Sequence, residues 1–447
     1  MAAKLSISFW SAVVSTGLPH SAVTAMKAAI SQRCGNHKTK MALIVQKFGG
    51  TSVGDLDRIR NVAQRVKLEV DAGNQVAVVV SAMAGTTNQL VEWARDIGPL
   101  HDAREYDAIV ATGEQVTVGL LAIALQNIGI DARSWLGWQI PVQTDDVHGA
   151  ARIESIDTTV MRERLAAGQV AVVAGFQGIA PDGRIATLGR GGSDTSAVAL
   201  AAALDADRCD IYTDVDGVYT TDPRIAPKAT KLDQITFEEM LEMASLGAKV
   251  LQTRSVAMAM RHNVNLQVRS SFSDAPGTLV VNEDSIVEQE KISGIAYSPD
   301  EAKITIQGLP DKPGVAAEIF GDLATNHVNV DMIVQSAASE GQKADITFSL
   351  GRADLAKALE IIDGAKGSLG FDDVVAKENV TKISVVGMAM RSQPGVAKTM
   401  FQTLAERGIN LEVISTSEIK ISVLIASDYT ELAVRSLHTA FGLDAED

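Results

Sequence analysis

The stretch ALIVQKFGGTSVGDLDRIRNVAQRV, residues 42–66, decides the fold of the first half of the chain. Its first seven residues are mostly apolar and typical of a strand, and two glycines follow them. Leu56, Ile59, Val62 and Val66 then recur at helical spacing. A strand, a glycine turn and a helix in this order bring backbone amides to a point where they can approach a phosphate closely.

The same alternation continues along the chain. Apolar runs typical of buried strands occupy 75–82 and 169–175, and we expect helices over 107–128 and 193–204. Continuous apolar strands that alternate with helices indicate a mostly parallel sheet covered on both faces. We therefore expect an α/β fold with a three-layer αβα domain over residues 41–285, whose ligands bind at the carboxyl ends of the strands.

The last third of the chain contains an internal repeat. DKPGVAAEIFGDLATNHVNVDMIVQS at 311–336 and SQPGVAKTMFQTLAERGINLEVISTS at 392–417 are identical at 10 of 26 positions without gaps. Each copy lies between strand patterns, so each predicts a small ferredoxin-like βαββαβ module. We expect the first module at 301–377 and the second at 378–447, after a polar linker near 282–290.

Composition narrows the class of protein. The 447 residues carry a formal net charge of −15, with 46% apolar and 21% charged residues, which is typical of a globular protein. The excess negative charge argues against nucleic acid or an anionic membrane as the main partner. No apolar run approaches the ~18 residues of a membrane span. The two cysteines, Cys34 and Cys209, exclude a disulfide scaffold and favour a reducing, cytoplasmic location.

Residues 1–40 differ from the rest of the chain. They hold no Asp or Glu and carry Lys4, Lys27, Arg33, Lys38 and Lys40, so the segment has a charge of +5. An acid-poor, Ser-rich, basic start is typical of a transit peptide. A disordered or mis-assigned extension is the preferred interpretation, because a methionine at position 41 directly precedes the first strand pattern.

Three segments at the ends of strand patterns are candidate ligand loops. In KFGGTS at 47–52, Lys47 and the N-terminus of the following helix favour a phosphate, although an ordinary strand-to-helix turn remains an alternative. In GRGGSDTS at 189–196, capping explains the Ser and Asp but not three glycines with Arg190, whose guanidinium suits a carboxylate. The third segment, TDVDGVYTTDPR at 213–224, is by itself also compatible with a polar surface loop.

Other known signatures are absent from the sequence. It has no Gly-Lys dipeptide, which excludes a Walker A loop, and no His-Glu dipeptide, which excludes a zincin helix. Asp194 stands where a dinucleotide fingerprint needs glycine, so a Rossmann dehydrogenase is disfavoured. Seven scattered His and two Cys give no metal-ligand spacing.

Taken together, these segments resemble the aspartate kinases of the amino acid kinase superfamily, over essentially all 407 residues from Met41. The motifs that carry the resemblance stand in the family's order: KFGGTSV at 47–53, VVVSAMAGTTNQL at 78–90, TGEQ at 112–115, GRGGSD at 189–194, YTDVDGVYTTDPR at 212–224 and LGAKVL at 246–251. The internal repeat is similar to paired ACT domains, which are small amino-acid-sensing modules.

The resemblance implies that ATP phosphorylates the side-chain carboxylate of L-aspartate to 4-phospho-L-aspartate, the first step toward lysine, threonine and methionine. This carboxylate is already ionised near neutral pH, because an unperturbed Asp has a pKa of about 4, so no general base is needed. The difficulty is electrostatic, because an anion must approach a polyanionic triphosphate. The site must therefore supply positive charge, helix N-termini and Mg²⁺.

The resemblance also assigns residues to roles. The implied catalytic residues are Lys47, Asp194 and Lys249. Lys47 would bridge the transferred phosphoryl group, and Asp194 would orient Lys47 or assist the metal. The implied aspartate-binding residues are Ser81, Thr87, Glu114, Arg190 and Ser193, with Arg190 on the α-carboxylate and Glu114 at the α-ammonium. The implied ATP-binding residues are Lys47, Phe48, Gly49, Gly50, Thr213, Asp214, Tyr219, Arg224 and Lys249. We expect ATP phosphates and water to hold Mg²⁺, and name no protein ligand.

Two of these residues have plainer interpretations without the resemblance. Glu114 fits a solvated helix face, and Lys249 fits a surface lysine on a helix.

The paired modules imply feedback inhibition by end-product amino acids, with lysine, threonine or both as effectors and at least a homodimer as the assembly. The implied effector-facing residues are Asp311, Gly314, Asn329, Asp331, Gln335 and Asn410. The alternative for Asn329 and Asn410 is that each simply takes a left-handed turn conformation.

Other functions stay open. A kinase acting on glutamate or acetylglutamate shares the fold and the phosphate loops but is not expected to carry KFGGTS or tandem ACT-like repeats. A non-catalytic amino-acid-sensing regulator would not need Lys47, Arg190, Asp194 and Lys249 intact. A fusion with homoserine dehydrogenase is disfavoured, because the chain ends about 20 residues after the last repeat strand.

Overall fold

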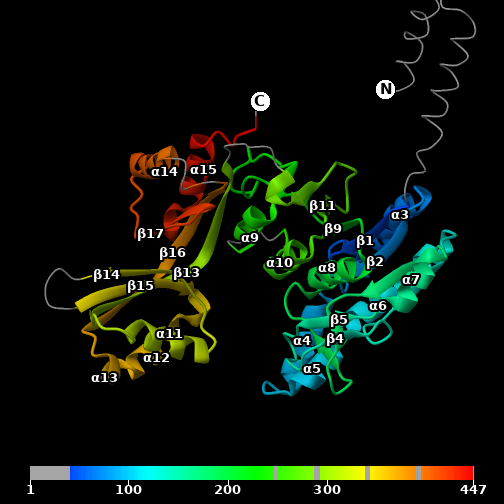
Figure 1. The fold of residues 1–447 in the computed structure, drawn as a ribbon, viewed down its shortest axis with the longest axis horizontal. Coiled ribbons are helices and arrows are strands. Elements are labelled where there is room, and N and C mark those ends of the chain that lie inside the picture. Colours follow the sequence, from blue (N-terminus) through cyan, green and yellow to red (C-terminus); the bar gives the residue numbers. More distant parts are fainter. Residues whose placement is uncertain are drawn as a thin grey trace, which may run out of the picture. The chain divides into compact units, whose positions relative to one another are not determined.

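The computed structural model describes residues 41–245, 250–285, 292–337, 343–388, 390 and 394–445. The predicted extension 1–40, most of the linker near 282–290 and the candidate catalytic residue Lys249 lie outside the described residues. Figure 1 shows an α/β domain followed by a second region built on its own sheet.

An eight-stranded sheet with the order β10-β12-β11-β9-β1-β2-β6-β3 forms the centre of the first domain. All of its pairings are parallel except that of β11 with β12. The strands are β1 (Leu43–Phe48), β2 (Gln75–Val80), β3 (Ala132–Trp135), β6 (Val170–Ala174), β9 (Arg208–Thr213), β10 (Gln234–Thr236), β11 (Leu266–Ser270) and β12 (Thr278–Val281). A smaller four-stranded sheet contains β4 (Val142–Thr144), β5 (Ile153–Ile156), β7 (Gln177–Ile179) and β8 (Ile185–Thr187).

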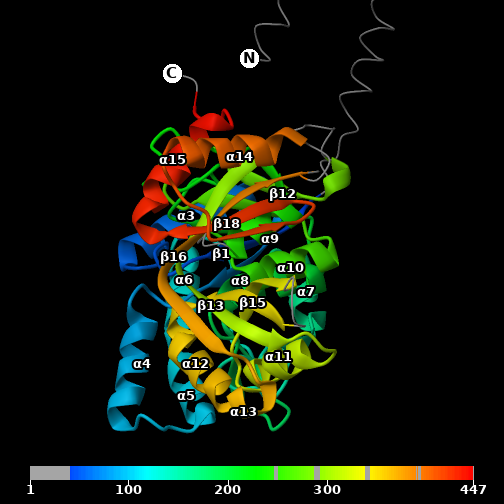
Figure 2. The same ribbon diagram turned by 90° about the vertical axis from the view of Figure 1, so that its left-hand side faces the viewer.

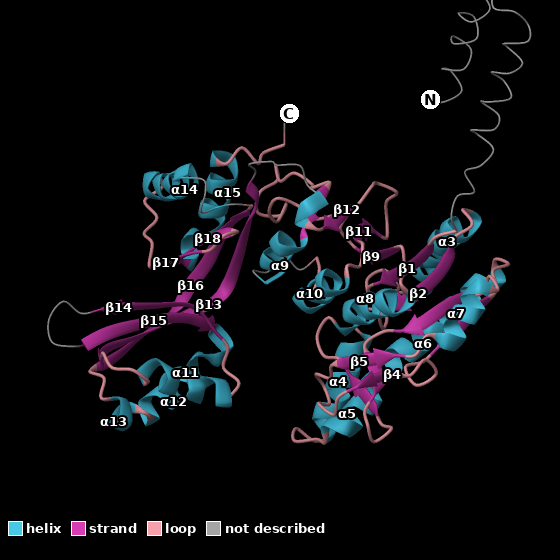
Figure 3. Cartoon of the chain, viewed as in Figure 1, coloured by secondary structure: helices cyan, strands magenta, loops and turns pink. Residues whose placement is uncertain are grey.

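Helices cover both faces of the large sheet, which confirms the three-layer fold predicted from the sequence (Figure 3). Alternate residues of β2 enter separate cores: Val78 and Val80 pack on one face, Ala77 and Val79 on the other. The first face carries α3 (Leu56–Asp71) and α6 (Thr112–Asn127). The second carries α7 (Thr159–Ala166), α8 (Gly192–Leu204), α9 (Phe237–Ser245) and α10 (Thr253–His262).

The predicted helix over 107–128 is two helices, α5 (Ala103–Val110) and α6, joined at Ala111; α4 (Thr86–Ile97) precedes them. Within the described residues, the stretch Ala103–Asn127 is long and apolar enough to cross a membrane by length and composition. Half of its most apolar window is buried in the protein, where Val118, Leu121 and Leu125 pack on the sheet. Core packing therefore accounts for its apolar composition.

The second region contains a six-stranded sheet with the order β14-β15-β13-β16-β18-β17. Its strands are β13 (Ile292–Pro310), β14 (Val330–Ala337), β15 (Lys343–Gly351), β16 (Asp373–Gly387), β17 (Val413–Thr416) and β18 (Lys420–Ala426). Its helices are α11 (Val315–Thr325), α12 (Leu355–Gly364), α13 (Lys366–Leu369), α14 (Pro394–Glu406) and α15 (Thr430–Ala440). Figures 1 and 2 show α11 with α12, and α14 with α15, as two separate pairs.

Two long strands, β13 and β16, run through both modules. Residues 301–310 of β13 pair with β15 and with the first part of β16, and they pack in the core of α11 and α12. Residues 292–298 pair with 382–387, and Ile295 packs in the core of α14 and α15. The second module therefore takes one of its four strands from residues that precede the first module, an exchange that the prediction of two successive modules did not include.

This exchange predicts an asymmetric effect of two alanine substitutions in the second module. Ile295 is 1% exposed, whereas Ile414 on β17 is 44% exposed. Ile295→Ala leaves a cavity in the core and is expected to lower the free energy of unfolding by about 2–4 kcal/mol. Ile414→Ala is expected to change it by about 0.5 kcal/mol or less. Urea unfolding measures both, and equal effects would contradict the place of residues 292–298 in this core.

Candidate active site

The carboxyl ends of β2, β1 and β9 lie side by side at one edge of the large sheet. Lys47 and Phe48 end β1, Ser81 follows β2, and Thr213 ends β9. The Ser81 amide donates to the Phe48 carbonyl at 3.1 Å, and the Gly49 amide donates to the Tyr212 carbonyl at 3.3 Å. Parallel pairing therefore brings the first and third glycine- or turn-rich segments together, as ligand sites in such sheets require.

Lys47 and Asp194 form the ion pair at the centre of this edge. Lys47 Nζ lies 2.6 Å from Asp194 Oδ1, and both side chains are almost buried, at 12% and 9% exposure. Asp194 stands in the first turn of α8, so the second glycine-rich segment reaches the same edge. Behind it, a Cβ on Gly175 would lie 2.9 Å from Ser193 Cβ, which shows how closely α8 packs on the end of β6.

The KFGGTS loop leaves little room for larger side chains at its two glycines. A Cβ on Gly49 would lie 3.3 Å from Lys47 Nζ, and a Cβ on Gly50 would lie 3.0 Å from the Ala82 carbonyl oxygen. Phe48 is fully buried and stacks on Tyr212 with ring centroids 4.5 Å apart, so its ring does not face this edge. Only main-chain atoms of Phe48 are therefore available to a ligand.

The helix that follows KFGGTS is a weaker anion site than the sequence indicated. Asp55 caps α3, because its carboxylate accepts from the Arg58 amide at 2.8 Å. By contrast, α4 begins after Gly85 and α8 after Gly191, and neither has a side-chain cap. Uncapped N-terminal amides favour anions, so α4 and α8 offer this electrostatic contribution instead of α3.

Glu114 lies in the first turn of α6 and is buried, with 3% of its surface exposed, so the interpretation as a solvated helix face is wrong. Its Oε1 accepts from the Ala82 amide at 2.9 Å, directly after Ser81. Its Oε2 is buried and has no hydrogen-bond partner in the described part of the chain. Burial raises the pKa of Glu114 to about 7, against the hydrogen bond from Ala82. Such an oxygen can accept from a cationic donor.

The other candidate aspartate-binding residues lie on the loops and helix starts around this edge. Ser81 follows β2 and Ser193 is buried in the first turn of α8. Thr87 lies half-buried in the first turn of α4, and Arg190 is exposed in the loop that precedes α8.

The candidate ATP residues of the third segment are spread along one loop after β9. Thr213 lies beside β1, where its hydroxyl donates to Asp214 at 3.0 Å. Tyr219 and Arg224 lie further along the loop: Tyr219 donates to Asp216 at 2.8 Å, and Arg224 pairs with its neighbour Asp222 at 2.7 Å. Among described residues, no group of three or more His, Cys, Asp or Glu is placed to hold a metal ion.

Sequence patterns missed a buried acid that supports the Arg190 loop. Asp107 on α5 is fully buried, and its Oδ2 accepts from the amides of Gly149 at 3.1 Å and Thr187 at 3.0 Å. The same oxygen lies 2.8 Å from Nδ1 of His148. Asp107 thereby connects α5 to residues 148–149 and to Thr187, two residues before Gly189. Gly189 itself lies close to Gly149. Because those segments lie far apart in sequence, no local motif indicates this role.

The model of the amino acid kinase family matches residues 42–270, and ACT-domain models match 303–367 and 383–441. The chain belongs to the amino acid kinase family and carries two ACT domains.

Its relatives narrow this class. The chain is 56% identical over 407 residues to an aspartokinase of Pseudomonas aeruginosa, covering 91% of this chain and 98% of that protein. It is 49% identical to an aspartokinase of Mycolicibacterium smegmatis, with the same coverage. E. coli aspartokinase III in complex with aspartate and ADP matches with a TM-score of 0.76 at 28% identity, over 90% of this chain and 100% of that one. Its complex with lysine and aspartate matches with a TM-score of 0.69 at 28% identity, over 89% and 99%. Within the family, the chain is one of the aspartate kinases, as the sequence motifs predicted.

The raised pKa of Glu114 predicts how stability depends on pH. The carboxyl has a pKa of 4.5 when unperturbed and about 7 in the folded protein, so folding opposes its ionisation. The resulting cost is absent below pH 4.5, grows as pH rises to 7, and then stays at about 3 kcal/mol. The free energy of unfolding of Glu114→Gln, relative to the unchanged chain, is expected to rise by about that amount between pH 4.5 and 8.

Glu92→Gln on the exposed face of α4 is the matched control, and its difference from the unchanged chain is expected to stay level over this range. Denaturant unfolding at each pH measures both variants. A level difference for Glu114→Gln as well would overturn the raised pKa.

Proposed function

We propose that this chain transfers the γ-phosphoryl group of ATP to the side-chain carboxylate of L-aspartate, giving ADP and 4-phospho-L-aspartate. The observation that carries the proposal is the nearly buried ammonium of Lys47, held 2.6 Å from Asp194 at the carboxyl end of the central strand β1. The bound aspartate and ADP named for the E. coli relative support it. The cytoplasm is the proposed location.

Lys47 supplies positive charge where the aspartate carboxylate would approach the negatively charged phosphates of ATP. Negative charge develops on the transferred group while a second anion approaches, so a fixed cation in a water-poor site lowers the barrier. The ion pair with Asp194 keeps the lysine side chain in one orientation. The amides of the KFGGTS loop and the uncapped start of α8 add partial positive charge on the same side. Mg²⁺ bound by ATP phosphates and water would supply the remaining neutralisation.

We assign recognition of L-aspartate to groups of opposite charge. The free Oε2 of Glu114 suits the α-ammonium, because a cation there restores the hydrogen bond that the buried oxygen lacks. The guanidinium of Arg190 suits the α-carboxylate, which it can bind with two parallel hydrogen bonds. Ser81, Thr87 and Ser193 would supply the hydroxyl groups. Both charged residues would bind the α-ammonium and α-carboxylate groups, so the side-chain carboxylate stays free to react with ATP.

For ATP we assign Lys47, the main chain of 48–50, and the loop that holds Thr213, Asp214, Tyr219 and Arg224. Thr213 follows the strand next to β1, which fits a nucleotide at this edge. Tyr219 and Arg224 carry an aromatic ring and a guanidinium to the outer part of the loop. Lys249 is also assigned to the phosphates, and this assignment rests only on the sequence resemblance.

Regulation by lysine, threonine or both through the ACT domains completes the proposal, with a dimer formed through these domains. Asp311, Gly314 and Gln335 line one cavity of about 380 Å³ between β14 and the start of α11. Gly314 has a φ of 100°, which glycine adopts without strain. Lysine is named in the complex of the E. coli relative.

The other candidate effector residues lie outside that cavity's lining. Asp331 pairs with Lys382 at 2.6 Å, and Asn329 and Asn410 are exposed. The left-handed alternative for these two asparagines is wrong, because the left-handed positions are His327 and Gly408, with φ of 58° and 69°.

Trapping of the acyl phosphate with hydroxylamine tests the proposed reaction. With ATP and Mg²⁺, we expect hydroxamate from L-aspartate and none from glutamate or acetylglutamate. Product from another acid would keep the phosphate site and overturn the roles of Arg190 and Glu114. No product from any acid, with the protein folded, would favour a non-catalytic regulator.

Two variants sharpen the same experiment. Lys47→Ala is expected to lower kcat by about 100-fold or more, because a preorganised charge at the transferred group is lost. Arg190→Ala is expected to raise the KM for aspartate about tenfold or more, because a charge-assisted pair of hydrogen bonds is lost. Lys67→Ala, which removes a surface lysine paired with Asp71, is the control and is expected to leave both constants unchanged.

Effector binding is tested by Gln335→Ala and Asp311→Ala. We expect each to raise the concentration of lysine or threonine that half-inhibits the enzyme, by about tenfold, while uninhibited activity stays the same. Asp363→Ala, on the exposed part of α12 in the same module, is the control. Unchanged inhibition in both cavity variants would place the effector elsewhere.

A further inference from the structure

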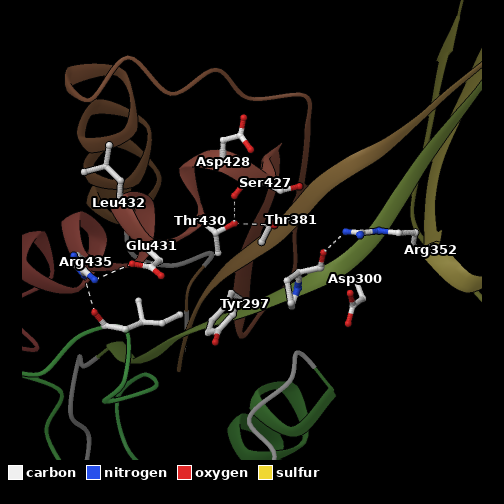
Figure 4. A pocket seen from close by; sticks show the side chains of 12 residues that line it. Tyr297, Asp300, Arg352, Thr381, Ser427, Asp428, Thr430, Glu431, Leu432 and Arg435 are labelled. Atoms are coloured by element: carbon white, nitrogen blue, oxygen red, sulfur yellow. Dashed lines mark hydrogen bonds and ion pairs between the residues drawn. The ribbon is translucent and has the colours of Figure 1, made fainter.

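The proposed nucleotide loop comprises residues 213–224. Its outer half and the residue that follows it, Ile225, are hydrogen-bonded to the second ACT domain. The Ile295 amide on β13 donates to the Thr220 carbonyl at 2.7 Å, and the Ile225 side chain packs against the core of that domain. Arg435 on α15 donates to the Ile225 carbonyl at 2.6 Å, beside an open pocket of about 780 Å³ (Figure 4). The regulatory domain therefore holds one side of the loop.

Residues 443–445 at the C-terminal end add two hydrogen bonds to this contact between the domains. The Ala445 amide donates to the Lys228 carbonyl at 2.8 Å, and the Thr230 hydroxyl donates to the Leu443 carbonyl at 2.9 Å. On the β13 side, a Cβ on Gly294 would lie 2.4 Å from the Thr220 carbonyl oxygen, so the strand and the loop are in close main-chain contact.

His438 on α15 is fully buried at the centre of this contact between the domains. Its Nε2 lies 2.8 Å from Thr220 Oγ1, and its Nδ1 lies 2.7 Å from Asp444 Oδ1. The hydrogen bond with His438 lowers the pKa of Asp444, whose carboxylate can then only accept. Nδ1 therefore donates to Asp444, and when Nε2 carries no proton it accepts from the Thr220 hydroxyl.

Thr220 is in turn held from both sides. Its Oγ1 accepts from the Thr230 amide at 3.0 Å, and its own amide donates to the Thr230 carbonyl at 2.9 Å. Its remaining main-chain and hydroxyl contacts come from Ile295 and His438 of the regulatory domain. Because Thr220 directly follows Tyr219 and stands four residues before Arg224, its placement sets the path of both candidate ATP residues.

We propose that His438 is a positioning residue for ATP: through Thr220, this histidine of the regulatory domain fixes the nucleotide loop of the kinase domain. The inference rests on the proposed role of the loop in ATP binding. A histidine that served only the stability of the ACT domain would affect both substrates alike, whereas a positioning histidine affects the KM for ATP alone.

Two substitutions of His438 separate its two hydrogen bonds. The amide of glutamine reaches the position of Nε2 and can still accept from Thr220, whereas the amide of asparagine reaches the position of Nδ1 and can bind only Asp444. We expect His438→Asn to raise the KM for ATP about three- to tenfold, with the KM for aspartate unchanged. His438→Gln is expected to restore most of the affinity for ATP.

Thr220→Val removes the partner hydroxyl and is expected to raise the KM for ATP to a similar extent. The double variant Thr220→Val with His438→Asn is then expected to show little further increase, because both changes remove the same bond. Full additivity of the two increases would overturn the coupling.

Ser422→Ala is the matched control. It removes a buried hydrogen bond of 2.6 Å between Ser422 and Ser384, inside the same domain but away from the loop, and is expected to leave the KM for ATP unchanged. The proposal is overturned if His438→Asn leaves that KM unchanged, or if Ser422→Ala raises it equally.

Arg224→Ala distinguishes the two levels of the argument. If it raises the KM for ATP and His438→Asn does not, the positioning role is wrong and the proposed loop stands. If neither variant changes that KM, the assignment of the loop to ATP is wrong, and the positioning role falls with it.

Discussion

The geometry of the site depends on parallel pairing of β1 with β2 on one side and β9 on the other. This arrangement places Lys47 between two loops and under the start of α8, where Asp194 meets it at 2.6 Å. Burying an ion pair brings little net stability, because desolvation of both charges offsets their attraction. This is consistent with the proposed catalytic role of Lys47, a fixed cation at the edge where two anions would meet.

The two charged residues proposed to recognise aspartate differ in burial. Glu114 is buried with an unpartnered oxygen, and Arg190 is exposed on the loop before α8. The buried acid costs stability as pH rises, because burial opposes its charge. In the proposed role of Glu114, a ligand ammonium would remove that cost and so favour binding of a zwitterionic substrate.

The sequence was sufficient for the elements whose information is local. Apolar runs predicted β1, β2 and β6, and the glycines after β1 predicted the turn that follows it. It could not show that residues 292–298 join the second ACT domain, because strand partners are set by tertiary contacts rather than by periodicity. The burial of Glu114, the cap on α3 by Asp55 and the meeting of His438 with Thr220 likewise depend on segments that only the fold brings together.

The strand β13 physically links the two proposed functions. At one end, Leu309 and Pro310 line the cavity that contains Asp311 and Gln335; at the other, Ile295 is bonded to the nucleotide loop through Thr220. β13 pairs with β16 over residues 292–298 and again from Glu301, whereas its pairing with β15 begins only at Glu301. Under the proposed regulation, an effector would act on the loop through β13 only if it bound one position of the cavity end more tightly than another. Differential binding of that kind is the thermodynamic requirement for inhibition at a distance.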